Sequence, residues 1–427
     1  MPGYIAVLPV IALRFPAGSW RAVACALAAV AVAAMAPRAS APDPPADDVR
    51  ALWVTRATLS SPEAVSRMVG AARAGGFNAL LVQVRGRGDA YYESSLEPRA
   101  AELSGQPDFD PLARTIAEAH AAGIQVHAWI AVNLVSSAAT LPASRDHLVY
   151  RNPEWLMVPR ALAAELGRVD TRSPEYLGRL ARWTRARSDE VEGLYASPLV
   201  PAAAAHVTAV VTELVERYEL DGVHLDYVRY PGAEYDYSQA ALQEFKRALR
   251  PDMTAAERRT ADTRERLDPL AYPNLYPQRW DAFRRSRLTS LVMRVRTAVK
   301  AARPSAILSA AVIPDAQEAY DVRLQDWRTW LDQALIDVLC PMAYTPEPRL
   351  FEQQIGLASA FASGRPVWAG IGAYRLSSAE TLRFITASRR LGTSGVILFS
   401  YDALVAPPNT ASTLTALGRA AFGDGSH

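Results

Sequence analysis

The chain has 427 residues, half of them hydrophobic and 21% charged, which excludes a disordered or fibrous protein and is long enough for one large barrel domain. A formal net charge of +2 excludes the strong basic surplus expected of a nucleic-acid-binding protein. The six histidines are scattered and show no metal-ligand spacing with the two cysteines, so we expect neither a metal nor a cofactor. Cys340 lies in an apolar segment, where a buried and inert thiol is expected.

Residues 1–41 have the pattern of a secretory signal peptide. Arg21 precedes an apolar run over residues 22–36, and the small residues 39–41 (ASA) are suitable for cleavage. Because the run is short for a membrane span, we expect cleavage and an extracytoplasmic protein, either periplasmic or secreted. The alternative is an uncleaved anchor, which would keep the protein at the membrane.

After a proline-rich linker over residues 42–49, short apolar or β-branched segments alternate with longer amphipathic ones. We expect strands over residues 51–55, 77–84, 124–131, 222–228, 306–313, 337–344, 366–372 and 395–400. Helices are expected over residues 61–74, 110–122, 202–218, 279–302, 350–363 and 378–391. Strand and helix repeated about eight times predict an α/β fold, a (β/α)8 TIM barrel over residues 50–427. A doubly wound open sheet is the alternative, but no glycine-rich phosphate loop follows the first strand.

Two connections are longer than a barrel requires, at residues 133–201 after the third strand and residues 229–278 after the fourth. Both leave the C-terminal ends of strands, which is the face where barrels build their active sites. Long loops at that face are more often walls of a substrate site than linkers, and we expect that role here.

The segment 221–231 (DGVHLDYVRYP) carries the strongest catalytic signal. Alternate residues of a strand share a face, so His224 and Asp226 are expected to point into the barrel mouth. Burying a carboxylate there is costly unless it is paired, which favours a catalytic role for Asp226. The alternative is that Asp226 ties down a loop. Asp221, at the start of the strand, is expected to brace a turn.

Polar and aromatic residues near the ends of the other strands are candidates for contact with the substrate. Arg85 should point inward with its neighbour at position 83 and pair with Asp226 or Asp89. Tyr344 shares an inward face with Met342, so its hydroxyl is placed to bond a sugar or a carboxylate. The predicted substrate-binding residues are Gln83, Arg85, His127, Trp129, Asn133, His224, Tyr344 and Tyr401. For His127 and Trp129, packing in the core is the favoured alternative.

The chain resembles the family 10 glycosyl-hydrolase-like proteins through the ordered segments QVRGRGDAYY, EAH…VHAW and DGVHLDYVRYP. The resemblance extends over about residues 50–402 and implies a (β/α)8 barrel, export to the bacterial envelope or beyond, and activity on glycans. Similar proteins include envelope glycosidases that cleave peptidoglycan strands stripped of their peptides. Many relatives carry two successive acids in the fourth strand, and here Tyr227 replaces the second. Residues 178–200 look like an insertion that would reshape the cleft.

Hydrolysis of a glycosidic bond usually requires two carboxyl groups. We expect Asp226 to be one of them, and Glu318, Asp315 and Asp89 are the candidates for the other, in that order. An N-acetyl group on the substrate can replace the second carboxylate as nucleophile. The predicted function is therefore hydrolysis of a bacterial cell-wall or surface polysaccharide, with peptidoglycan glycan as the first choice. The alternatives are a carbohydrate-binding barrel without catalysis and a glycosidase for an external polysaccharide.

Overall fold

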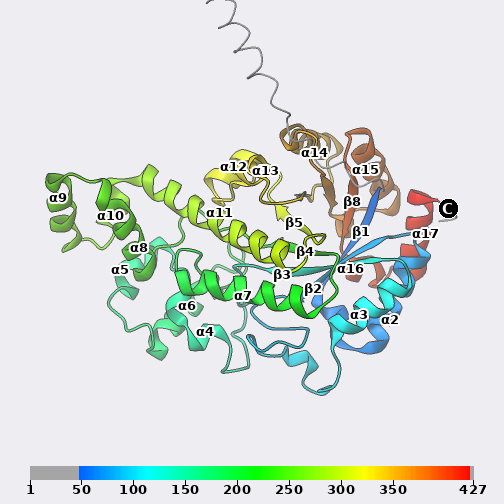
Figure 1. Cartoon of the computed structure of the whole chain (residues 1–427), viewed down its shortest axis with the longest axis horizontal. Helices are drawn as coiled ribbons and strands as arrows, with labels where there is room; N and C mark the ends of the chain where they lie inside the picture. Colours follow the sequence, from blue (N-terminus) through cyan, green and yellow to red (C-terminus); the bar gives the residue numbers. More distant parts are fainter. Residues whose placement is uncertain (1–47, 424–427) are drawn as a thin grey trace, which may run out of the picture. The chain divides into compact units, whose positions relative to one another are not determined.

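The computed structural model describes residues 48–423, in which eight parallel strands form a closed barrel in sequence order (Figure 1). The strands are β1 (Val49–Val54), β2 (Ala79–Arg85), β3 (Gln125–Ala131), β4 (Gly222–Asp226), β5 (Ile307–Val312), β6 (Val338–Ala343), β7 (Trp368–Ile371) and β8 (Gly395–Phe399). The predicted (β/α)8 barrel is confirmed, and every strand begins and ends within two residues of its expected bounds. The predicted signal peptide and the linker up to residue 47 lie outside the described residues.

Helices cover the outside of the barrel, one after each strand. They are α2 (Pro62–Ala74), α3 (Pro111–Ala121), α7 (Pro201–Arg217), α11 (Pro277–Ala302), α13 (Trp327–Asp332), α14 (Pro348–Ala362), α15 (Ser378–Arg390) and α17 (Ala411–Phe422). Five begin with proline, which suits a first turn because its missing N–H would have no partner there. Ser61 and Asp110 cap α2 and α3 by accepting hydrogen bonds from the amides of Ala64 and Ala113.

Two apolar layers hold the barrel together. On the outside, alternate strand residues such as Leu80 and Val82 pack against the helices. On the inside, Trp53, Trp368 and Cys340 are among the residues that fill the barrel. Cys340 is fully buried, as expected, and its burial raises the pKa of the thiol.

Asp221 braces the start of the fourth strand, as predicted from its position. Its Oδ2 accepts a hydrogen bond of 2.8 Å from the amide of Val126 at the start of β3. The same oxygen lies 2.9 Å from Nε2 of His120 on α3. The carboxylate therefore joins two neighbouring strands and a helix at the end of the barrel opposite the strand C-termini.

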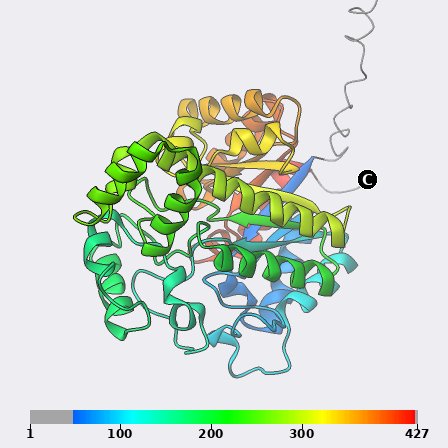
Figure 2. The same ribbon diagram turned by 60° about the vertical axis from the view of Figure 1, so that its left-hand side comes forward.

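The two long connections fold into short helices that lie together beside the barrel (Figures 1 and 2). The connection after β3 forms α4 (Leu148–Arg151), α5 (Ala163–Leu166) and α6 (Pro174–Arg185), and the one after β4 forms α8 (Gln239–Leu249), α9 (Ala255–Glu265) and α10 (Ala271–Leu275). The amide of Tyr237 donates to the carbonyl of Val158 at 2.8 Å, and the buried Asp236 accepts from the amide of Val158 at 2.8 Å. Backbone and side-chain hydrogen bonds thus fix each loop to the other. Within residues 48–423, no helix combines the length and apolar character needed to cross a membrane.

Candidate active site

A cavity of about 540 Å³ lies at the C-terminal ends of the strands. Its lining includes the aromatic residues Trp53, Trp129, Tyr227, Tyr344 and Phe399, three arginines and Asp226. Among the described residues, Asp226 is the single carboxylate that lines it. A concave site with aromatic walls and few polar groups is the usual form of a small-molecule or sugar site.

Asp226 is the last residue of β4 and its exposed fraction is 7%. Its Oδ2 accepts a 3.0 Å hydrogen bond from Nε1 of Trp129, and its Oδ1 accepts a 2.7 Å bond from the amide of Tyr227. Burial raises the pKa of this carboxyl above its usual value, although the charge of Arg229 and the two hydrogen bonds oppose that rise. A carboxyl group of raised pKa at the edge of a cavity is suited to donate a proton.

Tyr227 turns the chain out of the strand at this point. Its φ of 50° is in the left-handed region, which is unfavourable for a residue with a large side chain and is found most often at functional sites. The guanidinium of Arg229 lies 4.4 Å from the centre of the Tyr227 ring. Tyr227 lines the cavity as an aromatic wall.

Glu192 is an acid near Asp226 that sequence reasoning missed. Arg229 binds Oε1 of Glu192 at 2.9 Å, and the hydroxyl of Tyr195 donates to Oε2 at 2.6 Å. Although burial alone would raise the pKa of Glu192, the ion pair with Arg229 lowers it. Its side chain is 39% exposed and does not line the cavity. Nothing in the local pattern of residues 178–200 indicated that this acid would reach Arg229.

The three other predicted carboxylates do not line the cavity that contains Asp226. Asp315 and Glu318 are exposed, and Asp315 caps α12 (Ala316–Asp321) by accepting from the amides of Gln317 and Glu318 at 2.9 and 2.8 Å. Asp89 accepts a 2.9 Å hydrogen bond from the amide of Arg87 and lines an adjoining cavity of about 320 Å³, which shares Arg56 and Arg87 with the first. The structure therefore leaves Asp226 without a second carboxylate in its own cavity.

Of the predicted substrate-binding residues, Gln83, Trp129 and Tyr344 line the cavity. Met342 lines it as well, so the prediction that it shares an inward face with Tyr344 is confirmed. Tyr344 packs against the ring of Phe399 with 5.3 Å between the ring centres. These side chains form a polar and aromatic wall beside Asp226.

The prediction that Arg85 points inward to Asp226 or Asp89 is wrong. The register between β2 and β3 shifts between Gln83 and Arg85. The alternation of inward and outward side chains is broken there, so Arg85 does not face the interior of the barrel as Gln83 does. It is fully buried and its Nε donates to both carboxylate oxygens of Glu97 at 3.0 and 2.8 Å. Its Nη1 donates to the carbonyl of Ala131 at the end of β3. Arg85 therefore holds the loop after β2 against β3.

The two predicted histidines lie deeper in the barrel than the cavity. His224 accepts a 3.0 Å hydrogen bond from Nε1 of Trp53 and lies 2.9 Å from the hydroxyl of Ser309, and its burial lowers its pKa to about 3. His127 is fully buried against the ring of Trp368, and burial lowers its pKa to about 4. Both imidazoles are therefore neutral, and neither lines the cavity.

Asn133 and Tyr401 also lie outside the cavity lining. Asn133 is 2% exposed and its Nδ2 donates to the carbonyl of Arg229 at 3.1 Å, so it joins the loops after β3 and β4. Tyr401 begins α16 (Tyr401–Val405) and packs in the apolar layer outside the barrel. Within residues 48–423, no group of three or more His, Cys, Asp or Glu side chains is placed to hold a metal ion.

A closed parallel eight-stranded barrel with a buried acid and aromatic walls at the C-terminal ends of its strands is the arrangement found at the active-site face of (β/α)8-barrel enzymes. The chain belongs to the family described as Glycosyl hydrolase-like 10, whose profile matches residues 48–366. It is 26% identical over 290 residues to glycosyl hydrolase YngK of Bacillus subtilis, covering 63% of this chain and 46% of that protein. It is 23% identical over 295 residues to glycosyl hydrolase DigH of Escherichia coli, covering 64% and 56%. The chain thus spans about half the length of these curated relatives.

Solved structures of glycosidases share the fold. The glycoside hydrolase domain of PgaB (BpsB) from Bordetella bronchiseptica superposes with a TM-score of 0.58 and 17% identity, covering 87% of this chain and 98% of that one. The α-L-fucosidase isoenzyme 2 from Paenibacillus thiaminolyticus gives a TM-score of 0.57 and 17% identity, covering 88% and 49%. Because the sequence identities are only 17%, these similarities establish that the chain shares the barrel fold and nothing more.

Proposed function

We propose that this protein is an exported glycosidase that hydrolyses a bacterial cell-wall or surface polysaccharide, with peptidoglycan glycan strands as the first choice. The observation that carries the proposal is Asp226, a buried carboxyl of raised pKa at the cavity on the catalytic face of the barrel. The names of the relatives in Bacillus subtilis and Escherichia coli support hydrolysis of a glycosidic bond.

In the proposed reaction, protonated Asp226 donates its proton to the leaving oxygen as the bond between that oxygen and the anomeric carbon breaks. Because the described residues supply no second carboxylate to this cavity, the nucleophile is the carbonyl oxygen of an N-acetyl group on the substrate. Asp226, now ionised, then takes a proton from the water that attacks the resulting cyclic intermediate. Trp129 and Tyr227 hold the carboxyl in place through both steps.

Mass spectrometry of products from purified, peptide-free peptidoglycan strands tests this function. We expect new reducing ends and short oligosaccharides, and we expect N-deacetylated strands of the same length to be hydrolysed poorly. Hydrolysis that is indifferent to N-deacetylation would contradict the assisted mechanism. Strands that bind without releasing any reducing ends would favour the second candidate, a carbohydrate-binding barrel, which the replacement of an acid by Tyr227 also suggests.

Trp129→Phe is expected to move the decline of kcat/KM to higher pH. Asp226 must be protonated to act as the acid, so activity falls as the pH rises through its pKa. The indole N–H donates to the carboxylate and favours the ionised form, so its removal raises the pKa of Asp226 further. The pH profile of kcat/KM measures this shift, with Trp183→Phe on α6, outside the cavity lining, as the control. A shift to lower pH would contradict the role of Asp226 as acid.

A further inference from the structure

Two arginines that the catalytic proposal does not use also line the cavity. Arg56 follows β1 and Arg87 lies in the loop after β2. Among the described residues, neither guanidinium forms an ion pair or a hydrogen bond, and Nε of Arg87 is buried without a partner. The third arginine of the lining differs, because Arg229 is paired with Glu192.

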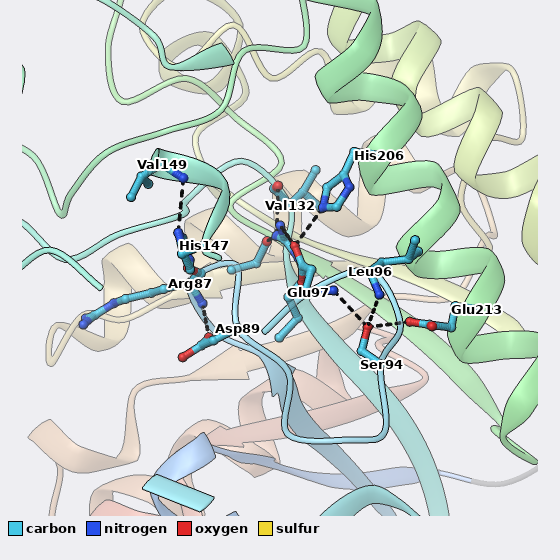
Figure 3. Close-up of polar contacts among 12 residues, drawn as sticks. Arg87, Asp89, Ser94, Leu96, Glu97, Val132, His147, Val149, His206 and Glu213 are labelled. Atoms are coloured by element: carbon cyan, nitrogen blue, oxygen red, sulfur yellow. Dashed lines mark hydrogen bonds and ion pairs between the residues drawn. The ribbon is translucent and has the colours of Figure 1, made fainter. Parts of the chain in front are cut away.

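The chain holds these two side chains in place without satisfying their charge. The amide of Arg87 donates to Asp89 at 2.9 Å, and its carbonyl lies 2.8 Å from Nε2 of His147. Figure 3 shows the side chain of Arg87 extending away from both of these contacts. Arg56 lies across Gly86, where a Cβ atom would come within 2.3 Å of its Nη1, so a larger residue at this position would displace the guanidinium.

This arrangement costs stability. Burial lowers the pKa of Arg87, and the like charge of Arg56 lowers it further. Asp89 is nearby, but its Oδ1 is bonded to the backbone amide of Arg87 and not to the guanidinium. Buried polar groups are nearly always satisfied in native proteins, and exceptions require an explanation such as a ligand. An anion between Arg56 and Arg87 would satisfy both charges.

We propose that Arg56 and Arg87 form a subsite for a carboxylate group carried by a sugar residue of the substrate. The inference rests on the proposed function, because it places the carboxylate in the same cavity as Asp226. Guanidinium groups bind carboxylates through pairs of charge-assisted hydrogen bonds, which gives both affinity and orientation. The substrate class is therefore an acidic glycan, whose carboxylate belongs either to a lactyl ether or to a uronic acid.

The test measures binding to the full chain carrying Asp226→Asn, so that hydrolysis does not intervene. The probes are peptide-free peptidoglycan fragments with free lactyl carboxylates, uronic acid oligosaccharides, and both sets after conversion of their carboxylates to amides. We expect amidation to weaken binding of the preferred probe about ten- to a hundredfold. Arg56→Gln and Arg87→Gln, added singly, should weaken binding of the acidic probe by a similar factor and leave binding of its amide unchanged.

Arg259→Gln is the matched control, because Arg259 is exposed on α9 and does not line the cavity. The melting temperature of the two cavity variants should equal or exceed that of the parent, since each removes one of two like charges. Preference for the lactyl or the uronic probe identifies the source of the carboxylate. Equal binding of each acid and its amide, or equal losses for both in the variants, overturns the subsite. Discrimination between acid and amide without turnover by the unmodified chain would instead refute the hydrolase proposal alone.

Discussion

Asp226→Asn is expected to lower kcat/KM for glycan hydrolysis by about 10²- to 10⁴-fold, which is the usual contribution of a general acid. Asparagine has nearly the same shape, and its single oxygen can accept one of the two hydrogen bonds that Asp226 receives, from Trp129 or from the amide of Tyr227. It cannot donate an acidic proton to the leaving oxygen. The variant removes a buried carboxyl that burial disfavours in its charged form but leaves one N–H donor without an acceptor, so the melting temperature should change by only a few degrees. Release of reducing ends and a thermal melt measure the two effects.

Asp221→Asn is the matched control for this variant. Asp221 lies at the other end of the same strand and outside the cavity, so full activity is expected. Substrates with a nitrophenolate leaving group need little protonation, so in the first turnover Asp226→Asn should release nitrophenolate with a much smaller loss of rate than it shows on natural substrates. An equal loss in that first-turnover rate would show that Asp226 does not act as the acid. Undiminished activity on both would remove it from the mechanism altogether.

The barrel could be predicted from sequence because its two periodicities are local. Strands such as residues 77–84 are short apolar runs, and helices such as residues 202–218 show the longer amphipathic repeat. Among the elements missed are α13 and α16, which have six and five residues. Elements of that length complete fewer than two helical turns, so they leave no repeat that could be recognised.

The direction of a side chain could be predicted better than its depth or its partner. Alternation along β4 indicated correctly that His224 and Asp226 point into the barrel, but the mouth begins only at Asp226. How deep a side chain lies in the barrel depends on the register of the neighbouring strands. That register places Trp53 and Ser309 around His224. The partner of Arg85 could not be predicted, because the register shift before it is invisible in an apolar run of sequence.

The buried ion pair between Arg85 and Glu97 stabilises the loop after β2, at the C-terminal ends of the strands. Glu97 lies in the loop after β2, and its Oε1 is 2.6 Å from Nη2 of Arg85 and 3.1 Å from Nε2 of His206 on α7. Figure 3 shows Glu97 directed towards His206, in the same loop as Arg87. The pair therefore fastens the loop that brings Arg87 to the cavity.

Glu97→Gln is expected to lower the free energy of unfolding by about 3–5 kcal/mol, because it leaves Arg85 buried with an uncompensated charge. Urea denaturation at neutral pH measures the loss. Glu352→Gln is the control, since Glu352 forms an exposed pair with Arg390 and should change the free energy by less than about 1 kcal/mol. Similar losses in both variants would contradict a special role for the buried pair.

The pH dependence of this loss follows from the pKa of Glu97. Although burial raises the pKa, the charge of Arg85 and the hydrogen bond with His206 outweigh it and hold the pKa at about 2. In the unfolded chain the pKa returns to about 4.3, so the ionised carboxylate stabilises the fold fully above that pH. The stabilisation is lost as the pH falls towards 2, because protons then bind the unfolded chain more readily. The difference between the wild-type protein and Glu97→Gln should therefore be constant from pH 7 to about pH 5 and shrink at pH 3, and a difference that grows on acidification would show that the carboxylate is not held ionised.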